Sequence, residues 1–190
     1  MRSSVPDSRP RFQSVRARVL TYFSPLMATV HLICGATGAG KTTYARALAK
    51  RVRGVRFSID DWLATLFLAD RPEPVTVAWV VERTARCEAQ MWAMAEEMLA
   101  RGTAVVFDVG LSRREHRDRF RLRAAQMGAD PKLHYLDVEQ ETRRERVRLR
   151  NADGKGPFGF EISDAMFDYM ERSYEVPGDD ELIGAMIGCF

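Results

Sequence analysis

The chain has 190 residues, of which 46% are hydrophobic, and a formal net charge of only +3. This length is sufficient for one α/β domain with a full core and is short for two. The weak net charge argues against a large nucleic-acid surface without excluding one, and no apolar run approaches the roughly 18–20 residues that cross a bilayer, so we expect no membrane partner.

Residues 1–26 differ in composition from the rest of the chain. Five arginines stand among serines and prolines, and Asp7 is the only acidic residue. Arginine-rich, acid-poor segments resemble targeting peptides, but no apolar stretch with a small-residue cleavage site follows. Met27 directly precedes the first predicted strand and is an alternative natural start. We expect residues 1–26 to form a basic extension, disordered or loosely docked, and residues 27–190 to form one domain.

A phosphate-binding motif follows the first predicted strand, the apolar run 30–34, and precedes a helix at 43–50. Residues 35–42 read G-A-T-G-A-G-K-T and satisfy the Walker A pattern G-x-x-x-x-G-K-[ST]. The glycines let backbone N–H groups converge on phosphate oxygens, and the helix N-terminus adds positive potential. We therefore expect a nucleoside triphosphate, ATP, to be bound by Gly35, Ala36, Thr37, Gly38, Ala39, Gly40, Lys41, Thr42 and Thr43.

Strand and helix signals then alternate, as in a parallel sheet with crossover helices. We expect strands at 55–59, 104–107 and 133–136, and helices at about 77–100 and 141–150. Ser112 to Glu115 has the S-x-x-E pattern of a capping box, which predicts a helix that ends near Gly128. Ser163 opens a further helix, and residues 182–190 suit either a strand or a helix. The expected fold is a three-layer α/β/α arrangement with a mostly parallel sheet of about five strands and a helical lid.

Acidic residues that end predicted strands are candidates for chemistry, because open α/β sheets bind ligands there. Asp108 ends its strand in the Walker B arrangement and, with the Thr42 hydroxyl, is a candidate ligand of Mg²⁺; a turn-capping role is the alternative. Asp60 ends the strand expected beside the nucleotide loop and is a candidate general base for an attacking hydroxyl. Asp61 competes for this role, although first helical turns favour acids on structural grounds alone. Lys41 is expected to reach the β- and γ-phosphates.

Arginines crowd the predicted helix 141–150, where Arg143, Arg146 and Arg150 share one face at three- and four-residue spacing. Phosphoryl transfer needs cations over the transferring phosphate, and a mobile lid often supplies them. We predict a lid at about 141–160 in which Arg146 and Arg150 contact ATP as catalytic residues. The remaining arginines of the helix are expected on the surface, and the glycines after the helix are consistent with a hinge.

The cysteines and histidines give no recognisable site in the sequence. The cysteines are far apart and lack C-x-x-C spacing, which favours reduced, mostly buried thiols in a cytoplasmic protein. The histidines are equally scattered and support neither a Ser-His-Asp arrangement nor a zinc site. The residues concerned are Cys34, Cys87, Cys189, His31, His116 and His134.

The order of these motifs resembles the small P-loop kinases, the family that includes adenylate, shikimate and gluconate kinases. The resemblance covers about residues 30–150 and is closest to the branch with polynucleotide 5′-kinase, zeta-toxin-like kinases and the predicted kinases of the AAA_33 type. It is carried by the Walker A loop, by Ser58 to Asp61, by Val105 to Asp108 with Arg113 to Arg119 beyond, and by Arg146-x-x-x-Arg150.

In that family the aspartate after the second strand activates the acceptor hydroxyl, and the Arg-x-x-x-Arg helix of the lid grips the ATP phosphates. The resemblance thus implies these roles for Asp60 and for Arg146 with Arg150. One position departs from the polynucleotide kinases: Leu63 stands where they usually carry an arginine, which puts a nucleic-acid acceptor in doubt.

The sequence predicts an ATP- and Mg²⁺-dependent phosphotransferase that acts on a hydroxyl group of a small-molecule or nucleotide-like acceptor. Two alternatives stay open: an ATPase or nucleotide switch that acts through a protein partner, and a zeta-toxin-like kinase of a nucleotide-sugar. The sequence identifies neither the acceptor nor the oligomeric state.

Overall fold

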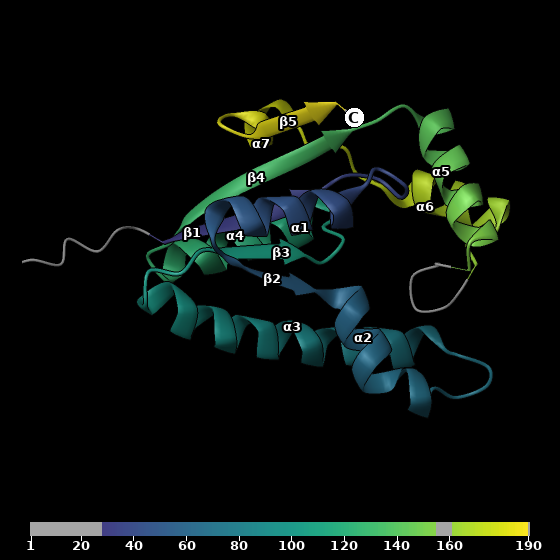
Figure 1. Ribbon diagram of the computed structural model, residues 1–190, viewed down its shortest axis with the longest axis horizontal. Coiled ribbons are helices and arrows are strands. Elements are labelled where there is room, and N and C mark those ends of the chain that lie inside the picture. Colours follow the sequence, from purple (N-terminus) through teal and green to yellow (C-terminus); the bar gives the residue numbers. More distant parts are fainter. Residues whose placement is uncertain (1–27, 155–160, 190) are drawn as a thin grey trace, which may run out of the picture.

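A computed structural model describes residues 28–154 and 161–189 of the chain. The basic extension expected at 1–26 lies outside these ranges, as do residues 155–160 of the expected lid. Five parallel strands form one sheet in the order β2-β3-β1-β4-β5 (Figure 1). The strands are β1 (Thr29–Cys34), β2 (Val55–Ser58), β3 (Val105–Asp108), β4 (Asp130–Asp137) and β5 (Met186–Cys189).

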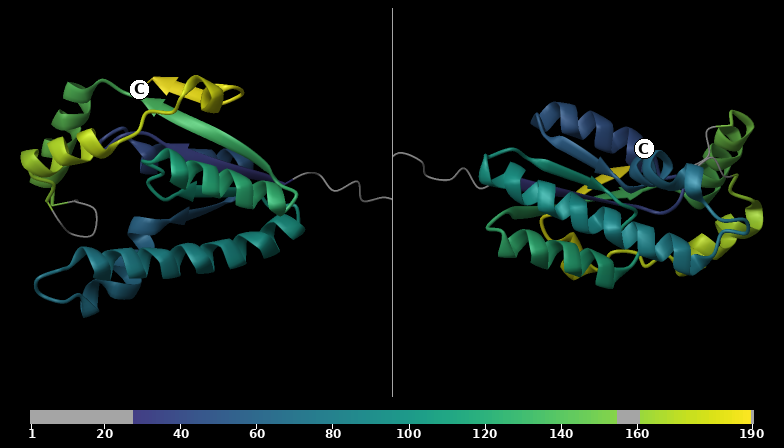
Figure 2. Two further views of the ribbon diagram at one scale, coloured as in Figure 1. Left: turned by 180° about the vertical axis from the view of Figure 1, so that it is seen from behind. Right: turned by 90° about the horizontal axis from the view of Figure 1, so that it is seen from below.

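Helices cover both faces of the sheet and stand at its carboxyl end, where α2, α5 and α6 gather (Figures 1 and 2). Among the described residues, none of them combines the length and the apolar character that a membrane crossing needs. The helices are α1 (Lys41–Val52), α2 (Ile59–Phe67) with the 3-10 turn η1 (Leu68–Asp70), α3 (Val77–Ala100), α4 (Arg114–Gln126), α5 (Gln140–Ala152), α6 (Asp164–Ser173) and α7 (Asp179–Leu182).

Strand β1 lies at the centre of the sheet, between β3 and β4. Successive side chains of a strand point to opposite faces. Val30, Leu32 and Cys34 accordingly pack in the core cluster that also holds buried residues of α3 and α4. Ile33 points to the other face and packs in the cluster that includes the buried residues of α1. The three-layer α/β/α architecture predicted from the sequence is confirmed.

Aromatic rings fill the larger of the two core clusters. Trp92 of α3 packs on Phe107 of β3 with ring centroids 4.5 Å apart, and on Phe120 of α4 with centroids 5.1 Å apart. All three side chains are at most 2% exposed. Aromatic pairs at these distances add roughly 0.5–1.5 kcal/mol each to the benefit of burial. This packing fixes β3, and with it the carboxyl end of the sheet, against the helices.

The chain turns into a helix earlier after β2 than we expected. The strand ends at Ser58, whose hydroxyl accepts a hydrogen bond from the Asp61 N–H at 3.3 Å and caps α2. Asp60 and Asp61 therefore lie in the first turn of a helix rather than at a strand end. In the sheet, β3 lies between β2 and β1, the strand that leads into the Walker A loop.

Three further predictions concerned two helix starts and the last element. The predicted capping box at Ser112 was wrong: α4 begins at Arg114 without a local side-chain cap. Instead the Glu175 carboxylate, from far along the chain, accepts a hydrogen bond from the Arg114 N–H at 2.7 Å. Ser163 does cap α6, as predicted, by accepting from the Met166 N–H at 3.2 Å. The end of the chain forms strand β5, parallel to β4.

Candidate active site

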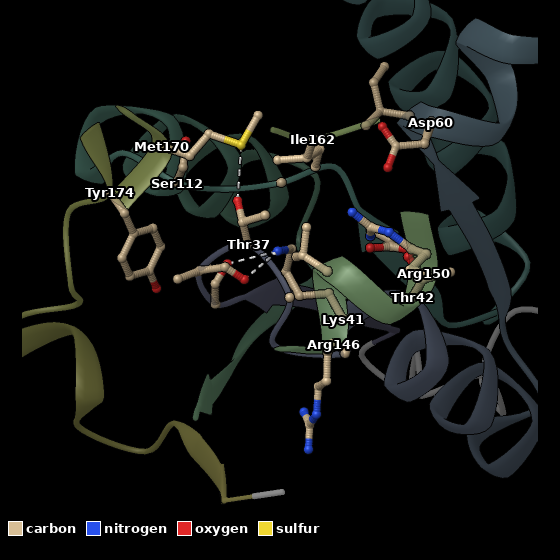
Figure 3. Close-up of a pocket in the computed structure, with 18 of the residues that line it drawn as sticks. Thr37, Lys41, Thr42, Asp60, Ser112, Arg146, Arg150, Ile162, Met170 and Tyr174 are labelled. Atoms are coloured by element: carbon tan, nitrogen blue, oxygen red, sulfur yellow. Dashed lines mark hydrogen bonds between the residues drawn. The ribbon is translucent and has the colours of Figure 1, made fainter. Parts of the chain in front are cut away.

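A cavity of about 1000 Å³ lies at the carboxyl end of the sheet (Figure 3). Its walls come from the Walker A loop and the start of α1, from α2, from the end of β3, and from α5 and α6. It brings together most residues selected from the sequence, namely Gly35, Ala36, Thr37, Gly38, Gly40, Lys41, Thr42, Thr43, Asp60, Asp108, Arg146 and Arg150. Ala39 does not line the cavity; it is buried in the core cluster beside α1.

The Walker A loop has the backbone shape of an anion-binding nest. Gly38 and Gly40 adopt positive φ angles of 82° and 89°, a region that L side chains enter only at a cost. Gly40 is the N-cap of α1 and has no side chain with which to bond the first N–H groups, and the first turn of α1 holds no acidic residue. These N–H groups are the donors that bind phosphate at a helix N-terminus.

Lys41 lies folded against the loop that precedes it. Its Nζ donates to the carbonyl oxygens of Gly35 and Ala36 at 2.9 and 3.0 Å. Loss of water on burial lowers the pKa of Lys41, and the nearby carboxylates of Asp108 and Asp60 oppose that change. The ammonium group is thus held at the cavity wall, where anionic oxygens of a ligand would be stronger acceptors than neutral carbonyls.

Asp60, in the first turn of α2, and Asp108, at the end of β3, face the same cavity. Ser58 of β2 stands opposite Asp108 of β3 in the parallel register, so the turn that follows β2 begins beside Asp108. Asp108 is buried, whereas Asp60 is exposed on the cavity wall. Partial loss of water, followed by repulsion from Asp108, raises the pKa of Asp60; Lys41 and Arg150 act in the opposite direction. A carboxylate with a raised pKa is suited to accept a proton.

Arg56 of β2 belongs to this site, although sequence analysis did not select it. Its Nε and Nη2 donate to Oδ2 of Asp108 at 3.1 and 2.7 Å, and its Nη1 donates to Oδ2 of Asp61 at 2.7 Å. Arg56 thus forms an ion pair with Asp61, the alternative candidate for the general base. The one signal in the sequence was that this arginine is the single charged residue of its strand.

The arginines of α5 divide into two groups. Arg146 and Arg150 line the cavity, as predicted. Arg150 points toward Asp60, and its Nε and Nη2 are buried without a hydrogen-bond partner among the described residues (Figure 3). Arg146 extends in another direction, and its Nη1 comes within 3.9 Å of the position that a Cβ on Gly40 would take.

The expectation that the other arginines of α5 lie on the surface was wrong for Arg143. Its side chain is buried and is not part of the cavity wall. Arg144 and Arg148 form ion pairs with Asp164 of α6, and Arg144 also pairs with Asp168. Such pairs between two helices cannot be read from the spacing within one of them.

The family model AAA_33, which describes an AAA domain, matches residues 30–177. The chain belongs to this family. No curated protein matches the AAA_33 chain by sequence.

Solved structures share the fold of this AAA_33 domain at low sequence identity. A Chloroflexus aurantiacus protein provisionally described as a kinase aligns with a TM-score of 0.68 and 17% identity, over 86% of this chain and 88% of its own. Chaetomium thermophilum Kti12, in complex with ADP-AlF3, aligns with a TM-score of 0.62 and 19% identity, over 85% and 89% of the two chains. A gluconokinase of Sinorhizobium meliloti aligns with a TM-score of 0.57 and 16% identity, over 86% and 83%.

The side chains of the AAA_33 cavity fit a magnesium ion that is shared with phosphates. The Thr42 hydroxyl and the Asp108 carboxylate both line the cavity, and oxygen donors of this kind are the ligands of Mg²⁺. Within the described ranges, no three His, Cys, Asp or Glu side chains are grouped so as to hold a metal ion. Magnesium commonly uses one or two protein ligands, with water and substrate phosphates completing its shell.

Two of the histidines meet on adjacent strands of the sheet, and two of the cysteines are buried in the core. His31 and His134 meet between β1 and β4, with Nδ1 and Nε2 2.9 Å apart, and Tyr44 of α1 contacts the second nitrogen of His134 at 2.8 Å. None of the three lines the cavity. Cys34 and Cys87 are free and buried, as expected, and the Cys189 side chain lies outside the described part of the chain.

Proposed function

We propose that this AAA_33 domain transfers the γ-phosphate of ATP to a hydroxyl group of a small-molecule or nucleotide-like acceptor. The observation that carries the proposal is the position of Asp60: a carboxylate of raised pKa faces the same cavity as the Walker A loop and lies near Arg150, whose Nε and Nη2 have no hydrogen-bond partner among the described residues. A protein that only binds nucleotide needs the loop but not a base across from it. The gluconokinase among its structural neighbours supports the proposal of a phosphotransferase.

The residues of the cavity divide into those that hold phosphate and those that act on the acceptor. The backbone nest and Lys41 bind the phosphates. Thr42 and Asp108 hold Mg²⁺, which when bound neutralises charge on the β- and γ-phosphates. Arg146 and Arg150 of the lid stabilise the charge on the transferring group. The main contributions of the protein are therefore positioning and electrostatic stabilisation.

Asp60 performs the proton transfer of the reaction. The acceptor oxygen forms a bond to the γ-phosphorus while the bond from that phosphorus to the β,γ-bridging oxygen breaks, and ADP leaves with the bridging oxygen. The acceptor proton passes to the Asp60 carboxylate. The cavity of about 1000 Å³ is at the upper end of the range for ligand sites and accommodates a nucleotide together with a small acceptor. The two free thiols of the core suit a reducing compartment such as the cytoplasm.

Product analysis tests this function directly. The protein is incubated with MgATP and a metabolite extract that includes nucleotide-sugars, and phosphorylated products are sought by mass spectrometry. The Asp60→Asn variant, which keeps the shape of the side chain but cannot accept the proton, is the matched control. We expect product with the wild-type protein and a rate about 10²–10⁴-fold lower with Asp60→Asn at unchanged ATP affinity.

The alternatives give different results in the same assay. A nucleotide switch releases phosphate only when a partner protein is added and forms no phosphorylated metabolite. A kinase of nucleotide-sugars forms product only from that class, and its expression arrests growth unless Lys41 is replaced by alanine. Equal rates of product formation by the wild-type protein and Asp60→Asn would remove Asp60 from the mechanism.

A further inference from the structure

The guanidinium of Arg143 joins three parts of the molecule. Its Nε donates to the carbonyl oxygen of Val138, in the turn before α5, at 2.8 Å. Its Nη1 donates to the carbonyl oxygen of Thr37, in the Walker A loop, at 3.2 Å. Nη1 and Nη2 also donate to the two carboxylate oxygens of Glu171 on α6, the second at 2.7 Å. The side chain is only 8% exposed, so water does not compete strongly for these bonds.

The bond to Thr37 has a consequence for the next peptide group. In a planar trans peptide the C=O of one residue and the N–H of the following residue point in opposite directions. With the Thr37 carbonyl held by Arg143, the N–H of Gly38 points away from Arg143. Gly38 lines the cavity, whereas Arg143 does not. The contact thus favours the peptide orientation in which the Gly38 N–H is offered to a ligand of the cavity.

The backbone of α5 lies directly against the same glycine. A Cβ added to Gly38 would come within 2.5 Å of the Arg143 carbonyl oxygen. The loop also contacts α6, because the Thr37 hydroxyl donates a hydrogen bond to the sulfur of Met170 at 3.3 Å. The base of the α5–α6 pair is therefore packed on the loop, while Arg146 and Arg150 of α5 face the cavity.

We propose that Arg143 is a positioning residue of the phosphate loop, which it sets for triphosphate binding by holding the Thr37–Gly38 peptide in one orientation and anchoring that peptide to α6 through Glu171. The inference rests on the proposed function in one respect only, namely that the loop binds the phosphates of a nucleotide. Arg143 does not touch the ligand; it acts through the Gly38 N–H.

The neighbouring residue provides a matched control. Arg144 lies on the same helix, pairs with Asp168 on the same partner helix at 2.6 Å, and stacks on the same ring of Phe167. No contact joins it to the Walker A loop among the bonds of the described residues. A general role of arginine in holding α5 to α6 is shared by both residues, whereas the contact to the loop belongs to Arg143 alone.

The experiment compares Arg143→Met, Arg143→Lys and Arg144→Met in the full chain. Calorimetry measures the dissociation constants of MgATP and of inorganic tripolyphosphate, which carries the phosphates without the nucleoside, and urea unfolding reports the stability of each variant. We expect both ligands to bind about ten- to hundredfold more weakly to Arg143→Met, since a charge-assisted N–H bond to phosphate is weakened. Arg143→Lys should also lose affinity, because one ammonium cannot reach all three partners, and Arg144→Met should bind as the wild-type protein does.

Two results would overturn the proposal: wild-type affinity in a folded Arg143→Met or Arg143→Lys variant, or an equal loss of affinity in Arg144→Met. If Arg143→Met does not fold, the lysine variant decides. Failure of the proposed function is a separate outcome, because it appears as an absence of phosphorylated product from a wild-type protein that still binds MgATP. The comparison of affinities among the variants remains valid in that case.

Discussion

Arg56 and Asp108 are joined by two hydrogen bonds to a single oxygen: Nε and Nη2 of the arginine both donate to Oδ2 of the aspartate, at 3.1 and 2.7 Å. Their strands lie side by side in parallel register, and both side chains are largely buried. The remaining nitrogen, Nη1, binds Asp61 at 2.7 Å. One cation therefore fixes the acid at the end of β3 and the first turn of α2, which carries Asp60 into the cavity.

Removal of Arg56 should weaken the binding of magnesium. In Arg56→Met the Asp108 carboxylate loses the partner that orients it, and side chains that orient metal ligands typically affect metal affinity ten- to hundredfold. We expect the Mg²⁺ concentration for half-maximal phosphoryl transfer to rise by about that factor, with a smaller rise in Arg56→Lys. Titration of activity with Mg²⁺ at saturating ATP measures it. An unchanged magnesium dependence in folded Arg56→Met would show that Asp108 needs no such partner.

Asp60 should set the acidic limit of activity. The base works only when ionised, so kcat/KM falls as the pH drops through the pKa of Asp60, which burial and Asp108 raise above the ordinary 3.8. Arg150 lowers this pKa, and Arg150→Met should therefore move the acidic limb to higher pH, in addition to reducing the rate. Arg148 is exposed on the same helix and is paired with Asp164, so Arg148→Met is the control. Its kcat/KM should fall over the same acidic pH range as that of the wild-type protein. The pH dependence of kcat/KM checks both variants.

Gly38 and Gly40 should respond differently to a single methyl group. Both have positive φ angles, so alanine costs about 1–2 kcal/mol of backbone strain at either position. Only at Gly38 would the new Cβ meet backbone, 2.5 Å from the Arg143 carbonyl oxygen; at Gly40 the nearest atom is 3.9 Å away. We expect Gly38→Ala to be less stable than Gly40→Ala in urea and to bind ATP more weakly. Equal stability of the two variants would mean that α5 moves away from the loop at little cost.

Features that depend on the spacing of neighbouring residues could be predicted from the sequence. Features that depend on contacts with residues far along the chain could not. The Walker A loop, the position of Asp108 at the end of its strand and the bounds of α3 follow from patterns within a few residues. The order of the strands leaves no such trace, and neither does the identity of the group that caps α4. The sequence spacing places Arg143, Arg146 and Arg150 on one face of the helix. Arg143 is nevertheless buried, because it donates hydrogen bonds to Glu171 and to the Thr37 carbonyl oxygen.

A buried ion pair should hold α7 against α4. Arg117 of α4 donates from Nε and Nη2 to the two carboxylate oxygens of Glu181, both at 2.8 Å, and both side chains are fully buried. Arg117→Met leaves a buried carboxylate with only partial compensation from Arg121, and we expect a loss of about 3–5 kcal/mol in the free energy of unfolding. The control Arg114→Met removes an exposed pair with Asp180 and should leave the free energy of unfolding nearly unchanged. Urea unfolding distinguishes the two, and a loss as small for Arg117→Met as for Arg114→Met would contradict the prediction.

The histidine pair between β1 and β4 should make the fold sensitive to acid. Burial, with smaller contributions from His31 and Arg51, lowers the pKa of His134 to about 4, whereas the unfolded chain titrates near 6.5. Between these two values the unfolded state binds a proton that the folded state excludes, so the free energy of unfolding falls as the pH drops from 6.5 toward 4. The loss attributable to His134 is on the order of 2–3 kcal/mol at the lower value. His134→Gln removes this titration while keeping polar atoms for His31 and Tyr44. Urea unfolding at a series of pH values should therefore give a shallower acid slope for the variant, and an identical slope would mean that His134 gains its proton without unfolding.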